Sequence, residues 1–197
     1  FVTSGLGGMS GAQPKAAKIA GLVSVTAEVN PKAAYKRQEQ GWVDIVIEDI
    51  DELVTEVELA RKQGKDTSFA YLGNIVDVWE GFEKAGSTID FGSDQTSLHN
   101  PFAGGYYPVG MSYEDANHMM AEQPERFKDE VYKTLRRHAE AINKQTKRGT
   151  YFFDYGNAFL LEAGRAGADV FKTNSKDFKY PSYVQDIMGP LCFDYGF

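Results

Sequence analysis

The sequence predicts an α/β protein with a Rossmann-like fold, in which a mostly parallel sheet carries helices on both faces. Three observations predict this class. Short runs of β-branched and aromatic residues alternate with helical patterns along the whole chain. The first run opens directly into a glycine-rich turn at residues 5–11, and a helix-prone segment follows. The second run ends on the acidic residue Glu28, an order that is typical of dinucleotide-binding folds.

The composition limits the kind of protein. A length of 197 residues, 42% of them hydrophobic, predicts one domain over residues 1–197. The net charge of −7 without a basic segment argues against nucleic acid as a partner, and no run approaches the ~20 apolar residues that cross a membrane. The single cysteine, Cys192, excludes an internal disulfide and indicates a reducing compartment, the cytoplasm. Because the chain opens at Phe1 and stops at Phe197 without a polar tail, we expect a piece of a longer polypeptide.

The first unit carries the clearest local signals. Residues 1–3 predict the end of a strand, and the alanine-rich residues 12–20 predict a helix that Gly21 stops. Residues 22–27 are rich in β-branched side chains and predict the second strand.

The next helices are marked by their caps. Asn30 caps a helix that has Pro31 at its first position and ends at Gly41. An Asp-x-x-Glu pattern that starts at Asp49 begins a helix to about residue 63. The later β-type runs predict strands, at residues 68–72, 88–91, 151–153 and 168–171. The later helical patterns predict helices, after Asn74 and at residues 157–165 and 183–188.

Residues 112–148 predict a helical insertion that restarts at Pro124. Apolar positions lie near helical spacing with charges between them, so we interpret the segment as a pair of solvated helices. His118 and His138 lie on these charged helices and are expected to face solvent. With His99 they do not form a metal-binding spacing, so no metal ligand is assigned.

The glycine turn has a specific chemistry. Glycines between a strand and a helix expose backbone N–H groups at a helix N-terminus, where a phosphate can approach the main chain. Glu28, ~20 residues on, can accept hydrogen bonds from ribose hydroxyls and repels a 2′-phosphate, which favours NAD over NADP. Ser10 stands where the usual motif has its third glycine. The alternative is a tight turn that holds no ligand.

Polar groups also follow three other predicted strands, at Asn74 and at residues 94–99 and 154–157. Ligands of open parallel sheets bind beyond the carboxyl ends of the strands. The alternatives are helix capping by Asn74 and Asn157, a hydrogen-bonded loop start at 94–99, and core packing of Tyr155. Two further aromatic side chains in a loop either stack on a ring or pack within the loop: Tyr106 and Tyr107.

Four unusual motifs occur in the sequence: the turn at residues 3–14, the segment 92–101 with its Gly-Ser-Asp-Gln-Thr-Ser, the Gly-Tyr-Tyr-Pro at 105–108, and the Phe-Asp-Tyr-Gly-Asn at 153–157. Together they resemble the urocanase family, the urocanate hydratases. The resemblance runs from Val2 to Tyr195 and covers the central, NAD-binding Rossmann-like domain of that enzyme.

The resemblance implies a lyase of histidine degradation. Members add water to urocanate to give 4-imidazolone-5-propanoate, and NAD+ serves as an electrophile and not as a hydride carrier. The resemblance further implies flanking domains of the same polypeptide and a homodimer as the full-length enzyme. The family's catalytic cysteine lies beyond the end of this chain and Cys192 does not match it. We therefore assign no catalytic residue here and expect the isolated domain to be inactive.

The resemblance also implies a set of cofactor contacts. They are Gly8, Met9, Ser10, Glu28, Asn74, Ile75, Gln95, Thr96, Ser97, Leu98, His99, Tyr106, Tyr107 and Tyr155. Some members have an arginine near the adenosine end where this chain has Ala33.

Two other functions remain open. The Rossmann turn equally allows an NAD-dependent dehydrogenase, in which His99 or Tyr155 would serve as the acid or base. The chain is alternatively a binding module that holds NAD or a partner without catalysis.

Overall fold

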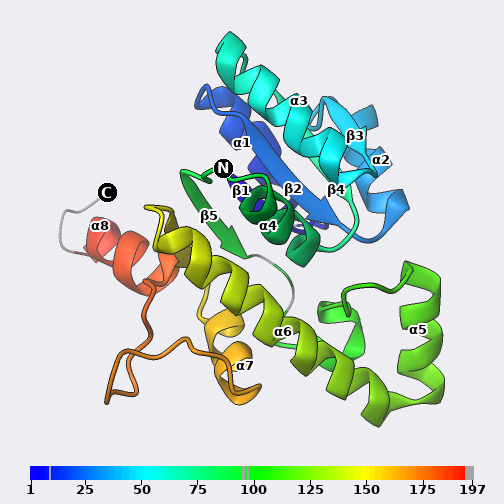
Figure 1. Ribbon diagram of the computed structural model, residues 1–197, viewed down its shortest axis with the longest axis vertical. Coiled ribbons are helices and arrows are strands. Elements are labelled where there is room, and N and C mark those ends of the chain that lie inside the picture. The colour runs from blue at the N-terminus through cyan, green and yellow to red at the C-terminus, as the bar shows by residue number, and fades with distance from the viewer. Residues whose placement is uncertain (9, 95, 97, 194–197) are drawn as a thin grey trace.

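The computed structural model describes residues 1–8, 10–94, 96 and 98–193. Its centre is a sheet of parallel strands in the order β3-β4-β2-β1-β5-β6 (Figure 1). The strands are short and nearly continuous in buried residues, as expected when helices cover a parallel sheet. Their bounds are β1 Val2–Ser4, β2 Ser24–Glu28, β3 Ile45–Ile47, β4 Ser68–Leu72, β5 Phe91–Asp94 and β6 Tyr151–Asp154.

The strand order places a switch point next to the glycine turn. From β1 the chain moves outward to β2, and it later returns past β1 to form β5 and β6 on the other side. Crevices of this kind, beyond the carboxyl ends of strands at a reversal of order, are where open α/β sheets bind ligands. Strand β3 adds only an outer edge beside β4.

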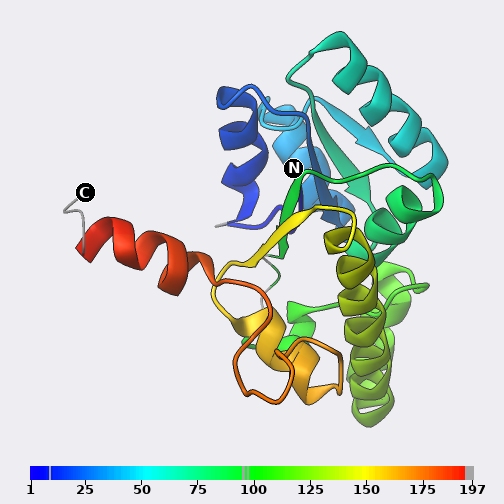
Figure 2. The ribbon, with the colours of Figure 1, turned by 60° about the vertical axis from the view of Figure 1, so that its left-hand side comes forward.

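Helices cover the two faces unequally (Figure 2). One face carries α1 (Gln13–Ile19) and α2 (Pro31–Glu39), which contact β2 and β4. The opposite face carries α3 (Ile50–Gln63), α4 (Ile75–Lys84), α6 (Pro124–Thr146) and α7 (Ala158–Arg165). The core lies mainly on this second face, around the fully buried Trp79 of α4.

The predicted elements of the first unit are confirmed, with caps as expected. Asn30 accepts a hydrogen bond from the backbone N–H of Lys32, and Asp49 accepts one from Glu52. Strand β3 was not predicted, because it is only three residues long and partly exposed. The strand predicted at 88–91 lies at Phe91–Asp94. The strand predicted at 168–171 was wrong, because that segment forms only an isolated bridge at Phe171.

The prediction of a solvated helix pair at 112–148 was wrong for its second half. Helix α5 (Tyr113–Glu122) buries only Ala116, but α6 packs along α4 and joins β5 to β6 as a crossover connection. The outer face of α6 is charged and its other, largely apolar face is buried, so its many charged residues gave the wrong impression of a solvated helix. His138 lies on that buried face with no exposed surface, so the expectation that it faces solvent was wrong, whereas His118 is exposed as expected.

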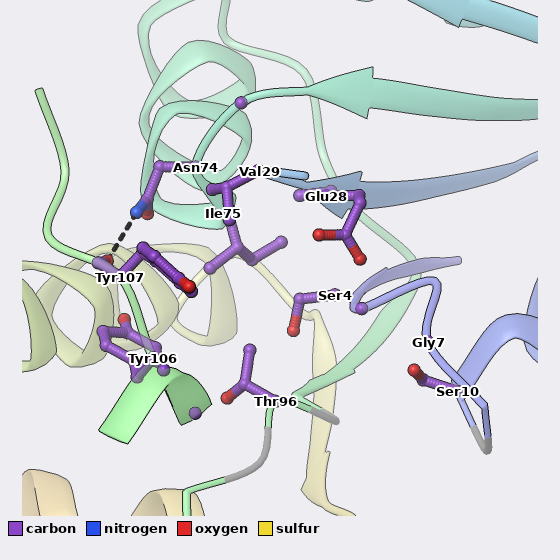
Figure 3. A pocket seen from close by; sticks show the side chains of 15 residues that line it. Ser4, Gly7, Ser10, Glu28, Val29, Asn74, Ile75, Thr96, Tyr106 and Tyr107 are labelled. Carbon is purple, nitrogen blue, oxygen red and sulfur yellow. Dashed lines mark hydrogen bonds between the residues drawn. The ribbon is translucent and has the colours of Figure 1, made fainter. Parts of the chain in front are cut away.

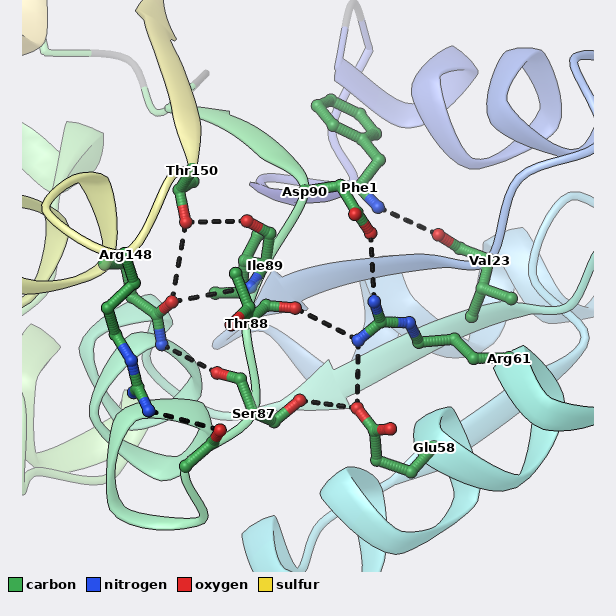
Figure 4. Close-up of polar contacts among 12 residues, drawn as sticks. Phe1, Val23, Glu58, Arg61, Ser87, Thr88, Ile89, Asp90, Arg148 and Thr150 are labelled. Atoms are coloured by element: carbon green, nitrogen blue, oxygen red, sulfur yellow. Dashed lines mark hydrogen bonds and ion pairs between the residues drawn. The ribbon is translucent and has the colours of Figure 1, made fainter.

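At the amino end of the sheet, polar groups pair with one another (Figure 4). The Arg61 guanidinium donates to Glu58 at 3.0 Å, to the Thr88 carbonyl at 3.0 Å and to Asp90 at 3.2 Å. The backbone nitrogen of Phe1 donates to the Val23 carbonyl at 2.9 Å. This end of the sheet therefore satisfies its charges internally.

The C-terminal part projects away from the sheet (Figure 2). It consists of a π-helical stretch, Tyr183–Met188, that continues into α8, Gly189–Phe193, and neither buries a residue. Cys192 is partly exposed in α8. Within the described residues, no helix combines the length and hydropathy required to cross a bilayer.

Candidate functional site

Two neighbouring cavities lie beyond the carboxyl ends of the strands, at the switch point. The first encloses about 220 Å³ between the glycine turn, the end of β2, the start of α4 and Tyr106–Tyr107 (Figure 3). The second encloses about 450 Å³ between the glycine turn and the ends of β5 and β6. Gly7, Ser10 and Thr96 line both cavities, so the two cavities adjoin, and we call the pair the groove.

The glycine turn offers unpaired donors to this groove. The backbone N–H groups of Gly7 and Gly8 have no hydrogen-bond partner among the described residues. A Cβ placed on Gly8 would meet no atom within 4 Å, so the space beside the main chain is open. Ser10 is buried at the point where the cavities meet. Unpaired N–H groups with free space before them are the arrangement that binds a phosphate.

Glu28 ends β2 and faces the first cavity. Its Oε2 accepts a hydrogen bond from the Leu6 backbone N–H at 2.7 Å, and its Oε1 accepts one from Asn30 at 2.9 Å. Burial raises the pKa of Glu28, and the backbone N–H groups of Asn30 and Leu6 oppose that rise. Each carboxylate oxygen keeps a lone pair that can receive a ligand hydroxyl.

Asn74 connects α4 to the loop across the first cavity. Its Oδ1 accepts the Val76 N–H at 3.0 Å, and its Nδ2 donates to the Tyr107 carbonyl at 2.8 Å. The Asn74 prediction of a helix cap is therefore confirmed, and the same side chain also holds the loop. Burial raises the pKa of Tyr107 to about 12, with Tyr113 contributing, so this phenol stays neutral.

Tyr106 is anchored by a buried histidine. Its ring is almost wholly buried, and its hydroxyl lies 3.0 Å from Nδ1 of His138. Burial lowers the pKa of His138 to about 4, so the imidazole is neutral at pH 7. This pair fixes the loop that forms one wall of the first cavity.

Two buried carboxylates line the second cavity. Asp94 and Asp154 are paired in register at the ends of β5 and β6. Asp94 accepts the Ser4 hydroxyl at 2.6 Å and the Thr96 N–H at 3.1 Å. Asp154 accepts the Leu160 N–H at 2.9 Å. The cavity wall is therefore negatively charged.

The environment of Asp154 is unfavourable for its charge. Burial raises its pKa to about 6, with the negative charge of Asp94 contributing. The hydrogen bond from Leu160 shows that Asp154, and not Asn157, caps α7; Asn157 adopts the left-handed conformation with φ 66° and its side chain makes no capping bond.

The groove brings together most of the predicted cofactor residues. Those that line it are Gly8, Ser10, Glu28, Asn74, Ile75, Thr96, His99, Tyr106, Tyr107 and Tyr155. Leu98 is buried in the core and lines neither cavity. Met9, Gln95 and Ser97 lie outside the described residues.

Arg37 was missed by the sequence analysis. It projects from α2 to the glycine turn and donates to the carbonyls of Leu6 and Gly7. No sequence signal indicates this contact, because the residues lie 30 positions apart and no motif joins them. No group of three or more His, Cys, Asp or Glu side chains within the described ranges is arranged to hold a metal.

Comparison with known proteins decides the family. The family described as "Urocanase Rossmann-like domain" matches residues 1–187. The chain belongs to the urocanase family. Urocanase relatives cover the whole chain: it is 55% identical to "Probable urocanate hydratase" of Dictyostelium discoideum, and 51% identical to the protein of that name in Caenorhabditis elegans and to "Urocanate hydratase" of Homo sapiens.

The match covers only part of each urocanase relative. All of this chain aligns, but it spans 30% of the length of each of these three proteins. The groove residues described above thus belong to the Rossmann-like part of a urocanase.

Proposed function

We propose that this chain is the NAD-binding domain of a urocanate hydratase. The enzyme would add water to urocanate and release 4-imidazolone-5-propanoate. The observation that carries the proposal is the groove itself, in which open amides at Gly7 and Gly8 stand beside a carboxylate at Glu28. These groups match the needs of a diphosphate and a ribose in a family whose relatives bear the name urocanate hydratase.

The first cavity suits the adenosine half of the cofactor. Glu28 would accept the ribose hydroxyls, and its charge would disfavour a 2′-phosphate. Asn74 and Tyr107 would keep the opposite wall in place through their hydrogen bond.

The second cavity suits the other half. A nicotinamide ring in its oxidised form is a cation, and the carboxylates of Asp94 and Asp154 would attract it. Tyr155 stacks on Tyr183 at 5.0 Å between ring centroids, which would hold its ring at the mouth of this cavity. When bound, NAD+ would supply an electrophilic ring in place of a hydride acceptor. This chain's residues would orient that ring against the substrate.

The test uses the full-length protein that contains this chain. Incubated with urocanate, it should remove the urocanate absorbance without forming NADH. With 2-hydroxy acids it should do nothing. Accumulation of NADH during turnover would instead make the protein a dehydrogenase and overturn the proposal.

A second measurement concerns the 197 residues alone. We infer that catalytic groups lie in the remainder of the polypeptide, so the isolated chain should not hydrate urocanate. Measurable hydration by this chain would contradict that assignment. Mass spectrometry of the undenatured full-length protein should detect bound NAD, and a protein that neither contains nor rebinds NAD would refute the cofactor assignment.

A further inference from the structure

Arg37 carries an unusual buried charge. Its residue is only 8% exposed, and no carboxylate among the described residues forms an ion pair with it. Its partners are the carbonyls of Leu6 (3.0 Å) and Gly7, the Gln40 side chain (2.7 Å) and the Trp42 ring, whose centroid lies 4.6 Å away. Buried charges are normally paired with an opposite charge. This guanidinium keeps its positive charge without a carboxylate partner and lies against the glycine turn.

The geometry of the peptide unit connects Arg37 to the open amides. In a trans peptide, the carbonyl of one residue and the N–H of the next point in opposite directions. Because the guanidinium binds the Leu6 and Gly7 carbonyls, the N–H groups of Gly7 and Gly8 must point away from it. Both glycines line the second cavity, so these N–H groups are turned toward the groove.

The surrounding residues leave room for this arrangement. A Cβ at Gly11 would overlap the Arg37 guanidinium, so glycine at that position permits the approach. The ammonium of Lys15 lies 5.4 Å from the centroid of the Trp42 ring that Arg37 also contacts. Two cations thus lie near the Trp42 ring.

We propose that Arg37 is the positioning residue of the anion site: it binds two carbonyls of the turn and thereby aims two amides at the cofactor's diphosphate. This inference rests on the proposed function, since it assigns a role toward the same dinucleotide. The planar fork of an arginine can hold both carbonyls at once, which the single ammonium of a lysine cannot do equally well. The guanidinium charge, separated from the ligand by the turn, adds attraction for a diphosphate.

The experiment separates the diphosphate from the rest of the ligand. Binding of ADP and of adenosine to the nucleotide-free full-length protein is measured by titration calorimetry. In Arg37→Met the affinity for ADP should fall ten- to a hundredfold, while that for adenosine changes less than twofold. Arg37→Lys keeps the charge and should restore only part of the ADP affinity. Arg61→Met, at the other end of the sheet, is the matched control and should bind both ligands as the wild type does.

Three outcomes would overturn the proposal. They are unchanged ADP affinity in a folded Arg37→Met, an equal loss for ADP and adenosine, and full recovery in Arg37→Lys, which would reduce the role to charge alone. If Arg37→Met does not fold by circular dichroism, the Arg37→Lys variant carries the same test. A wild-type protein that binds neither ADP nor NAD would refute the proposed function itself, independently of Arg37.

Discussion

Two arginines at opposite ends of the same sheet have opposite environments. Arg61, at the amino end, lies between Glu58 and Asp90, and about a third of its side chain is exposed. Arg37, at the carboxyl end, is buried and bonded only to neutral groups among the described residues. Arg61 at the amino end is therefore neutralised by carboxylates. The carboxyl end instead keeps charges of both signs that do not pair with one another.

This difference between the two ends indicates that the ligand binds at the carboxyl end. Unpaired amides line the groove at the glycine turn, which Arg37 holds from behind, and the carboxylates Asp94 and Asp154 line it at the ends of β5 and β6. A ligand with an anionic centre and a cationic end would satisfy both sides. Charges that are not neutralised lower the stability of the ligand-free protein. Preformed binding sites commonly lower the stability of a fold in this way.

The largest expected effect concerns acid stability at the carboxyl end. His138 has its pKa lowered to about 4, so between pH 6.5 and 4 the unfolded state binds a proton that the folded state does not, and unfolding becomes easier as the pH falls. Asp154 has its pKa raised to about 6, so between pH 6 and about 4 only the folded state takes up a proton, and its contribution rises as the pH falls. The two contributions oppose each other.

The variant Asp154→Asn removes one side of this balance. Between pH 6 and 4 it should lose about 3 kcal/mol more unfolding free energy than the wild type, because the raised pKa of Asp154 no longer offsets the lowered pKa of His138. Urea denaturation at several pH values measures this. Parallel curves for the two proteins would mean that Asp154 titrates normally and that the carboxyl end is not strained.

The second prediction acts on the glycine turn. Gly11→Ala should lower the unfolding free energy by about 1–3 kcal/mol, because the new Cβ would displace the Arg37 guanidinium from the Leu6 and Gly7 carbonyls. Gly8→Ala is the matched control, since its Cβ meets no atom within 4 Å. That variant should fold as the wild type does and yet retain less NAD, because the methyl group enters the space before the open amides. Equal thermal stability of both variants would contradict this view of the turn.

Much of this organisation follows from local sequence, but the charges at the carboxyl end do not. The glycine turn, Glu28 and the cap at Asn74 are encoded within a few residues, so they could be predicted. The pairing of Asp94 with Asp154 depends on the register between β5 and β6, which lie about 60 residues apart in the chain. Likewise, the burial of His138 depends on the packing of α6 against α4, which the charges on α6 conceal.

The third prediction tests the carboxylate of the first cavity. Glu28→Ala should weaken NAD binding by on the order of 1–3 kcal/mol, if its hydrogen bonds to the ribose are charge-assisted. It should also free the Leu6 and Asn30 amides, so the thermal stability is followed in parallel. The NAD content of the purified variant is the measurement. An unchanged NAD content would mean that Glu28 does not bind the ribose.

The smallest effect is expected at the amino end, and it completes the comparison. Arg61→Met breaks two partly exposed ion pairs, with Glu58 and Asp90, and such pairs contribute about 0–1 kcal/mol each. The loss in unfolding free energy should therefore stay near 1 kcal/mol and shrink further in high salt. NAD affinity should not change, because the groove lies at the other end of the sheet. A tenfold weaker affinity in Arg61→Met would show that the two ends are coupled, and the contrast between the two arginines would then no longer identify the site.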